Sequence, residues 1–268
     1  DQRKRRYGTE YDPDTEVLVT VGATEAIASS VLGLVEPDSE ILLIEPFYDS
    51  YSPVIAMAGC HRRAIPLRQD GRGFAIDIAA LRAAVTPKTK ALIVNSPHNP
   101  TGMVASDDEL RGLAELAVSA DLLVITDEVY EHLVFDGRQH RPLANYPGMA
   151  ERTITISSAG KMFNATGWKI GWACGPSDLI AGVRAAKQYL TYVAGAPFQP
   201  AVAHALATED PWVDALCASF QARRDRLGSA LSDIGFDVFD SFGTYFLCVD
   251  PRPLGYDDST SFCAQLPE

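Results

Sequence analysis

The chain lacks the cysteine patterns that disulfide-rich and zinc-binding proteins require. Its 268 residues include five cysteines, an odd number, and none of them forms a CxxC pair or shows metal-ligand spacing. Such scattered cysteines argue against a disulfide framework and against a zinc site. We expect no metal site, and we expect reduced thiols in the core of a cytoplasmic protein at Cys60, Cys174, Cys217, Cys248 and Cys263.

Long apolar runs and an excess of positive charge are missing as well. No run approaches the roughly 18 apolar residues that suggest a membrane span. The formal net charge is −12, and binding to nucleic acid or to an anionic membrane needs a basic surface. We interpret the one basic run, Arg3-Lys4-Arg5-Arg6, as a solvated helix end. The sequence therefore predicts neither nucleic acid nor membrane as a partner.

What the chain does have is a regular alternation of short apolar runs and amphipathic stretches. Continuous apolar runs of this length are typical of strands that are covered on both faces. The runs occupy 16–21, 40–46, 62–67, 90–97, 122–128 and 153–158. Strands that alternate with helices predict an α/β fold with a mostly parallel, doubly wound sheet.

Helical patterns separate these runs and continue after them. Stretches 24–35 and 107–120 read as amphipathic helices, and Ser106 can cap the second. Further helical regions at 176–195, 200–207 and 211–233 precede a predicted strand at 244–250. We expect a large domain over 1–235 and the start of a smaller C-terminal domain over 236–268. Because no element follows to cover the last segment, we expect the chain to be a fragment of a longer protein.

The unusual residues of the sequence follow the predicted strands at their carboxyl ends. They lie at 22–24, 47–48, 95–102, 127–130 and 157–161. In open α/β sheets, ligands bind outside the carboxyl ends of the strands. The repetition predicts one site at this edge of the sheet.

Gly22-Ala23-Thr24 forms the first of these segments, at a strand-to-helix turn. Free backbone N–H groups and the helix dipole favour an anion at such a turn. A tight turn without a ligand explains the same residues equally well. The turn lacks the GxGxxG pattern, which weakens a dehydrogenase interpretation.

The loop "NSPHNPTG" and the segment "TDEVY" provide polar side chains at two further strand ends. Asn99 can present its amide to an oxygen, although the loop can also be simply a rigid turn. Asp127 ends a strongly apolar strand, where a carboxylate needs a cation or strong hydrogen bonds. It is either a helix N-cap or a carboxylate that holds a protonated heterocyclic nitrogen.

Two lysines lie eight residues apart in "SSAGKMFNATGWKIGW", among small, aromatic and apolar residues. Such surroundings suggest that Lys161 and Lys169 are buried, and buried lysines are rare unless they are paired. An anionic or covalent partner is therefore expected for each.

Taken together, these segments resemble the pyridoxal-phosphate-dependent aminotransferases of fold type I, the aspartate-aminotransferase-like group. The resemblance spans nearly the entire chain. The matching motifs, in order, are "VGATEA", "EPFYDSY", "NSPHNPTG", "TDEVY" and "SSAGKMFNATGWKIGW". A lysine that forms the Schiff base and an aspartate on the pyridinium nitrogen are what the protein contributes to this cofactor.

The resemblance implies a role for each matching residue. Lys161 forms the Schiff base with pyridoxal phosphate and later moves protons. Asp127 keeps the ring nitrogen protonated, and Asn99 and Tyr130 hydrogen-bond the phenolic oxygen. The remaining cofactor-binding positions are Tyr48, which stacks on the ring, and Gly22, Ala23, Thr24, Ser158 and Lys169, which take the phosphate.

The resemblance also implies the reaction and the assembly. An amino-acid donor would pass its amino group to a 2-oxo acid, with 2-oxoglutarate as the expected acceptor, in a homodimer with a shared active site. The arginine that grips the substrate α-carboxylate would lie outside this chain. Tyr192 is either near the dimer interface or a core aromatic, and His98, His132 and His140 are expected to have no direct role.

The wording of the motifs is most similar to bacterial N-succinyldiaminopimelate aminotransferases of lysine biosynthesis. Kynurenine/glutamine aminotransferases and cysteine-S-conjugate β-lyases of the same fold are the enzymatic alternatives. A non-catalytic module that binds the cofactor and dimerises is the alternative outside enzymes.

Overall fold

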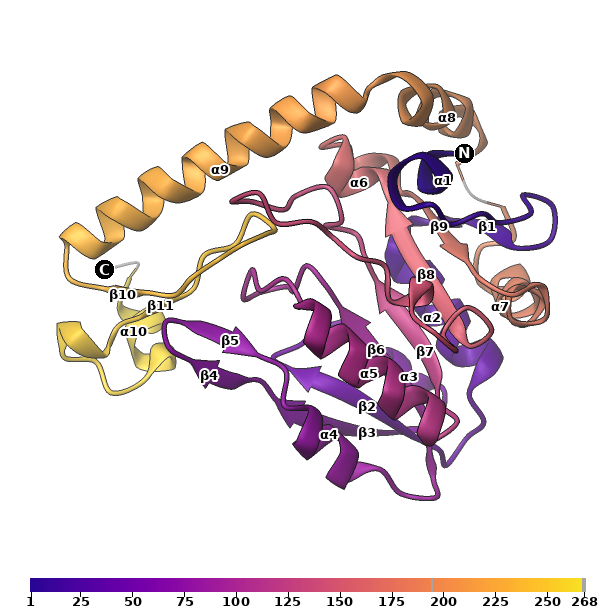
Figure 1. The fold of residues 1–268 in the computed structure, drawn as a ribbon, viewed down its shortest axis with the longest axis horizontal. Coiled ribbons are helices and arrows are strands. Elements are labelled where there is room, and N and C mark those ends of the chain that lie inside the picture. The colour runs from indigo at the N-terminus through magenta and orange to yellow at the C-terminus, as the bar shows by residue number, and fades with distance from the viewer. Residues whose placement is uncertain (194, 267–268) are drawn as a thin grey trace.

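A computed structural model describes residues 1–193 and 195–266, and its centre is a seven-stranded sheet with helices on both faces (Figure 1). The strands follow the order β1-β9-β8-β7-β6-β2-β3. Their bounds are β1 (Val17–Val21), β2 (Glu40–Glu45), β3 (His61–Pro66), β6 (Thr89–Asn95), β7 (Leu123–Asp127), β8 (Thr153–Ser158) and β9 (Ile170–Cys174).

Five neighbouring strands of this sheet, β3, β2, β6, β7 and β8, run parallel to one another. Strand β9 is antiparallel to β8 on one side and to β1 on the other. The predicted α/β fold with a mostly parallel sheet is confirmed. The six predicted strands are present, but the sequence analysis missed β9, which follows directly after Lys169.

Helices cover the two faces of the sheet and form two separate cores. On one face pack α2 (Gly22–Leu34), α3 (Tyr51–Met57) and α7 (Ser177–Leu190), and on the other pack α4 (Ile78–Ala84) and α5 (Asp107–Ser119). Successive side chains of a strand point to opposite faces. Ile41 and Leu43 of β2 therefore enter the first core, while Leu42 and Ile44 enter the second. This double burial explains the continuous apolar runs.

The start of α5 has the predicted cap. Ser106 accepts a hydrogen bond from the Glu109 backbone, and Glu109 accepts one from the Ser106 N–H at 2.7 Å, which completes a capping box. Both orphan N–H groups are thereby satisfied.

The chain after β9 is mainly helical, as predicted. Helices α8 (Gln199–Thr208) and α9 (Asp210–Asp233) follow α7, and α9 runs along the outside of the molecule, away from the central sheet (Figure 1). The shorter elements are α1 (Gln2–Tyr7), β4 (Arg68–Asp70), β5 (Gly73–Ala75), η1 (Leu143–Asn145), α6 (Ala159–Met162), η2 (Thr166–Trp168), η3 (Ala196–Phe198), β10 (Asp237–Val238), β11 (Val249–Asp250), η4 (Arg252–Leu254) and α10 (Ser259–Gln265).

The strand predicted at 244–250 is confirmed only at its end, where β11 pairs with β10. Thr244 has a positive φ of 66°, a left-handed conformation that interrupts an extended chain. The domain division between 235 and 236 stays a prediction, and residues 267–268 of the predicted second domain lie outside the described residues.

Three expectations about individual side chains are corrected. Arg3 is buried, so the basic run is not simply a solvated helix end. Cys60 and Cys174 are buried as expected, but Cys217 and Cys248 are only partly buried and Cys263 is exposed; all five thiols are free. Tyr192 is 72% exposed and is not a core aromatic.

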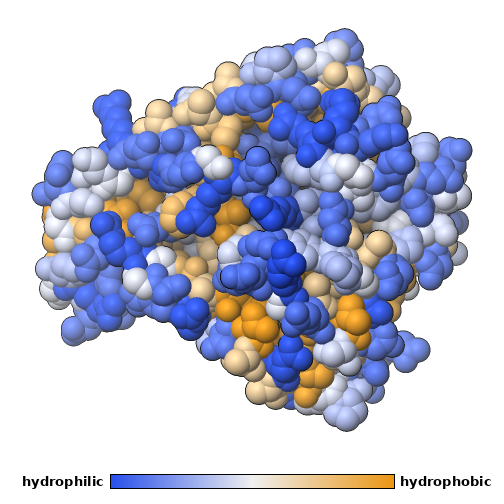
Figure 2. Space-filling view, in the orientation of Figure 1, coloured by the Kyte–Doolittle hydropathy of each residue, from blue (hydrophilic) through white to orange (hydrophobic). Residues whose placement is uncertain are grey.

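The surface in Figure 2 is mostly hydrophilic, with small apolar patches between polar side chains. Among residues 1–193 and 195–266, no helix combines the length and the apolarity needed to cross a bilayer.

Helices α2 and α7 approach each other closely at two glycines. A Cβ atom added to Gly33 would lie 2.4 Å from the carbonyl oxygen of Gly182. Since that neighbour is backbone, it cannot rotate away. The contact anchors α2, whose other end begins next to β1.

Replacing Gly33 by alanine is therefore expected to lower the free energy of unfolding by about 1–3 kcal/mol, the usual range for overpacking. Gly228 in α9 is the matched control, because its added Cβ would meet only ordinary contacts at 3.8 Å. Gly228→Ala should leave stability unchanged or raise it by up to about 1 kcal/mol through helix propensity. Urea unfolding of both variants measures the difference, and equal stability of the two would contradict the close-approach argument.

Candidate functional site

One cavity of about 190 Å³ lies at the carboxyl ends of the parallel strands. It contains every residue that the sequence analysis proposed for a site. Those lining residues are Gly22, Ala23, Thr24, Tyr48, Asn99, Asp127, Tyr130, Ser158, Lys161 and Lys169. The structure brings them together from five separate segments, while their individual roles stay predictions.

Asp127 is the buried carboxylate of this cavity and ends β7. The Tyr51 hydroxyl donates to its Oδ2 at 2.7 Å, and the Val129 N–H donates to its Oδ1 at 3.3 Å. Burial raises the pKa of Asp127, and these two hydrogen bonds oppose the shift. The helix N-cap interpretation is wrong, because the described residues that follow Asp127 form turns rather than a helix.

Asn95, which the sequence analysis did not single out, connects the Asn99 loop to Asp127. Its Nδ2 donates to the Asp127 carbonyl at 2.9 Å, and its Oδ1 accepts from the Asn99 N–H at 2.7 Å. In the same loop, His98 hydrogen-bonds Thr101 at 2.8 Å, and burial lowers its pKa to about 4. His98 thus supports the loop. Asn95 is the last residue of β6, so the rule that ligands bind at the carboxyl ends of strands could have identified it as well.

The two lysines have different environments. Lys161, on the short helix α6, is partly buried, and its Nζ donates to the Tyr245 hydroxyl at 2.6 Å. Lys169 is exposed, so the expectation that both lysines would be buried is wrong. Residues 166–168, directly before Lys169, are exposed rather than part of a core, and Lys169 itself has a left-handed φ of 54° and lines the cavity.

The N-terminus of α2 forms the part of the cavity that suits an anion. Gly22 begins this helix with a φ of +70°, and an added Cβ on it would lie 3.7 Å from Cδ of Lys169. Gly22 also lies close to β9, because an added Cβ on Gly171 would lie 2.5 Å from the Gly22 carbonyl carbon. Backbone N–H groups at a helix start and a nearby ammonium both attract negative charge.

Tyrosines surround the rest of the cavity. Tyr48 is 36% exposed and packs edge-on against Tyr51 with ring centroids 5.8 Å apart. The Tyr130 hydroxyl donates to the Tyr245 hydroxyl at 3.3 Å, and burial together with this bond raises the pKa of Tyr130. Sequence reasoning missed Tyr51 and Tyr245. Tyr245 belongs to no strand-end motif, and 84 residues separate it from Lys161.

The two other histidines lie elsewhere. His132 is hydrogen-bonded to Gln2 at 3.0 Å, and His140 to Glu128 at 3.0 Å. Neither is among the described residues that line the cavity.

Comparisons with known proteins agree with this geometry. The family model for class I and II aminotransferases matches residues 2–268. The chain is 75% identical over 267 residues to the probable N-succinyldiaminopimelate aminotransferase DapC of Mycobacterium tuberculosis, covering 100% of this chain and 67% of that protein. It is 39% identical over 266 residues to kynurenine–oxoglutarate transaminase 3 of Rattus norvegicus, covering 94% of this chain and 59% of that protein.

Solved structures show the same fold. The N-succinyldiaminopimelate aminotransferase of Mycobacterium tuberculosis superposes with a TM-score of 0.98 at 75% identity, over 99% of this chain and 69% of that one. A methionine aminotransferase of Escherichia coli superposes with a TM-score of 0.94 at 34% identity, over 99% of this chain and 69% of that one. The resemblance inferred from the motifs is confirmed, and the chain belongs to the class I and II aminotransferases, enzymes that transfer amino groups.

Proposed function

We propose that this chain forms the cofactor site of an N-succinyldiaminopimelate aminotransferase that uses pyridoxal phosphate and passes the amino group to 2-oxoglutarate. The observation that carries the proposal is the 75% identity, over the full chain, to the probable enzyme of that name. Lysine biosynthesis is the corresponding process. The cavity supports the proposal because its polar groups suit the different parts of this cofactor.

Pyridoxal phosphate, when bound, supplies an aldehyde that reacts with a lysine amine and a ring that accepts electrons. Asp127 suits the ring nitrogen of this cofactor. It is a buried carboxylate whose two hydrogen-bond donors, the Tyr51 hydroxyl and the Val129 N–H, are neutral. A protonated nitrogen beside it would give the buried anion a charged hydrogen-bond partner. Asp127 would in turn hold the proton on that nitrogen.

Lys161 is the amine that would carry the cofactor and move protons at the reacting carbon. The Tyr245 hydroxyl accepts from its Nζ and orients it within the cavity. Tyr130 and Asn99 present a hydroxyl and an amide to the same space, where they would bind the phenolic oxygen. Tyr48 would stack against the ring, since it lines the cavity and is only partly covered.

The phosphate would bind at the start of α2. Gly22, Ala23 and Thr24 line the cavity there, together with Ser158 and Lys169. A hydroxyl, an ammonium and helix N–H groups form a set of donors that suits a doubly charged phosphate.

We also propose that two copies associate in the cytoplasm. Tyr189 and Tyr192, at the end of α7, are 86% and 72% exposed, and Val193 is 66% exposed. Such apolar side chains close together on a surface are typical of an interface. The five free cysteines suit a reducing compartment.

A kynurenine or glutamine aminotransferase is the second candidate. It is favoured by the 39% identity to kynurenine–oxoglutarate transaminase 3, which is well below the identity that supports the first. A β-lyase would use the same lysine and aspartate. A non-catalytic module is disfavoured, because the chain is 75% identical over 267 residues to a probable aminotransferase.

The first prediction concerns Lys161. Borohydride reduction of the holoenzyme followed by peptide mass spectrometry should find the cofactor on Lys161, since its Nζ is held in the cavity by the Tyr245 hydroxyl. Lys161→Ala should abolish this attachment. Lys169→Ala is the control and should keep it while binding the cofactor less tightly. A reducible attachment that persists in Lys161→Ala would contradict the assignment.

The second prediction concerns Asp127→Asn, which keeps a partner for Tyr51 but removes the charge. Loss of a preorganised charge at the reacting centre should reduce amino transfer by about 100-fold or more. The cofactor-free variant should nevertheless be more stable than the cofactor-free wild type at pH 8. Burial raises the folded-state pKa of Asp127 above that of the unfolded chain. Asp127 therefore adds stability to the folded protein below the ordinary pKa of about 3.9, and this contribution is lost as the pH rises through the raised pKa.

Urea unfolding of both cofactor-free proteins at pH 4 and pH 8 measures this, and the advantage of the variant should be larger at pH 8. Asp121→Asn is the control, because that carboxylate is 93% exposed. Near-normal turnover of Asp127→Asn would rule out the ring-nitrogen role.

The third prediction concerns the amino donor. With 2-oxoglutarate as acceptor, kcat/KM for N-succinyldiaminopimelate should exceed that for kynurenine and for glutamine by about 100-fold, or 2.7 kcal/mol of transition-state binding. The measurement uses the full-length enzyme that contains this chain. Equal or better use of kynurenine or glutamine would favour the second candidate.

A further inference from the structure

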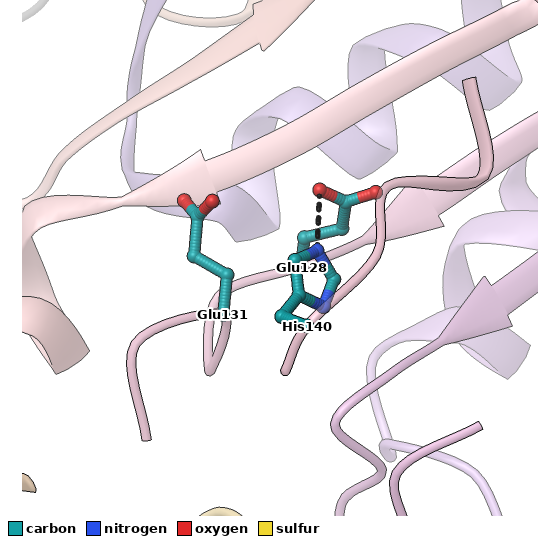
Figure 3. Close-up of side chains that lie close together, drawn as sticks. All are labelled: Glu128, Glu131 and His140. Carbon is teal, nitrogen blue, oxygen red and sulfur yellow. Dashed lines mark hydrogen bonds and ion pairs between the residues drawn. The ribbon is translucent and has the colours of Figure 1, made fainter. Parts of the chain in front are cut away.

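A second group of charged side chains lies behind the turn that carries Asp127 and Tyr130. Glu128 and Glu131 belong to the same turn but are not among the residues that line the cavity. Figure 3 shows the Glu128 carboxylate beside the His140 ring and the Glu131 carboxylate extending in the same general direction. One ligand atom from each of these three residues lies within 4.8 Å of the others, and all three residues are buried.

Arg3 reaches this group from helix α1, 125 residues earlier in the chain. Its Nη2 donates to Oε2 of Glu128 at 2.9 Å, and its Nη1 donates to Oε2 of Glu131 at 3.2 Å. The three side chains are 7%, 3% and 0% exposed. A guanidinium presents two donors in a rigid fork, so Arg3 holds both carboxylates at a set separation.

The two carboxylates have further partners. Nε2 of His140 is hydrogen-bonded at 3.0 Å to Oε2 of Glu128, the oxygen that Arg3 also contacts, and the Ser157 hydroxyl donates to Oε1 of Glu131 at 2.6 Å. Burial by itself would raise the pKa of Glu128, but Arg3 and His140 lower it to about 2. Burial would also raise the pKa of Glu131, but His132 and Arg3 lower it below its ordinary value. Both glutamates are therefore anions at neutral pH.

Two carboxylates and a histidine are also a ligand set that a divalent cation accepts. In this group positive charge already comes from Arg3, which donates to one oxygen of each carboxylate. The geometry favours a role for the arginine itself.

The backbone connects this group directly to the cavity. Glu128 follows Asp127, its N–H donates to the Ile156 carbonyl of β8 at 2.8 Å, and its carbonyl accepts from the Glu131 N–H at 2.9 Å. Tyr130 lies between the two glutamates in sequence. A shift of either carboxylate would therefore move the turn that aims Asp127 and Tyr130 into the cavity.

We propose that Arg3 is a positioning residue for the cofactor site: by holding Glu128 and Glu131 behind the turn, it fixes the orientation of Asp127 and Tyr130. This inference rests on the proposed function, because it assumes that these two side chains bind pyridoxal phosphate. Arg3 itself does not line the cavity and touches no reacting group.

The test compares Arg3→Met, Arg3→Lys and Arg5→Met in the full-length enzyme. Arg5 is the matched control, because it lies on the same helix but makes exposed contacts to Asp210 and the Leu206 carbonyl. The readouts are the Kd for pyridoxal phosphate, the visible circular dichroism of the bound cofactor, kcat and KM separately, and urea unfolding. The dichroism reports cofactor orientation, which a purely structural role would not change in a folded holoenzyme.

Arg3→Met is expected to raise the Kd by about tenfold or more, equivalent to 1.4 kcal/mol, to weaken the dichroism and to lower kcat more than it changes KM. Arg3→Lys should recover part of each, because an ammonium can pair with one carboxylate but lacks the fork. Arg5→Met should stay within about twofold of wild type, the scale of a surface ion pair. Wild-type dichroism and Kd in folded Arg3→Met, or equal losses in Arg5→Met, would overturn the proposal.

Arg3→Met leaves two buried anions without the guanidinium that they share and can fail to fold. A second variant, Arg3→Met with Glu128→Gln and Glu131→Gln, removes all three buried charges. It should fold and still show altered dichroism, since the fork is gone; wild-type dichroism in this variant would overturn the proposal. A wild-type enzyme that binds no pyridoxal phosphate would instead overturn the proposed function, whatever the Arg3 variants do.

Discussion

The parallel register of β6, β7 and β8 is the constraint on which the site depends. Asn95 and Asp127 are register partners at the ends of β6 and β7, and Ile156 of β8 pairs with Asp127 on the other side. Because parallel strands end at one edge of the sheet, the polar residues that follow each strand lie close together even though they are far apart in the sequence. Asn95 then bonds both the Asp127 carbonyl and the Asn99 N–H, so the register directly sets the distance between two segments of the cavity.

The turn after β7 separates two kinds of buried charge. Asp127 faces the cavity with neutral donors, and burial raises its pKa. Glu128 and Glu131 face away, and both pair with Arg3. Removing one partner of a buried ion pair costs about 3–5 kcal/mol, so the second arrangement is strongly maintained. The ion pairs of Arg3 thus support the turn that carries Asp127, and such support is what a preorganised site requires.

Close backbone approach is the second requirement of the site. The start of α2 lies against β9 so tightly that a side chain at Gly171 would meet the backbone of Gly22, and Gly33 lies equally close to Gly182 of α7. These contacts fix α2 at both ends. The first residues of α2 therefore line the cavity together with Lys169, where a helix start favours an anion.

The sequence by itself determined six strands of the central sheet, the α/β class and ten of the residues that line the cavity, because local apolar patterns and strand-end motifs carry that information. Only the tertiary structure decided that Lys169 is exposed, that Tyr51 bonds Asp127, that Tyr245 bonds Lys161, and that Arg3 pairs with Glu128. Such pairings join residues 76 to 125 positions apart. No periodicity or motif encodes them, since they arise when separate elements pack and buried charges find partners.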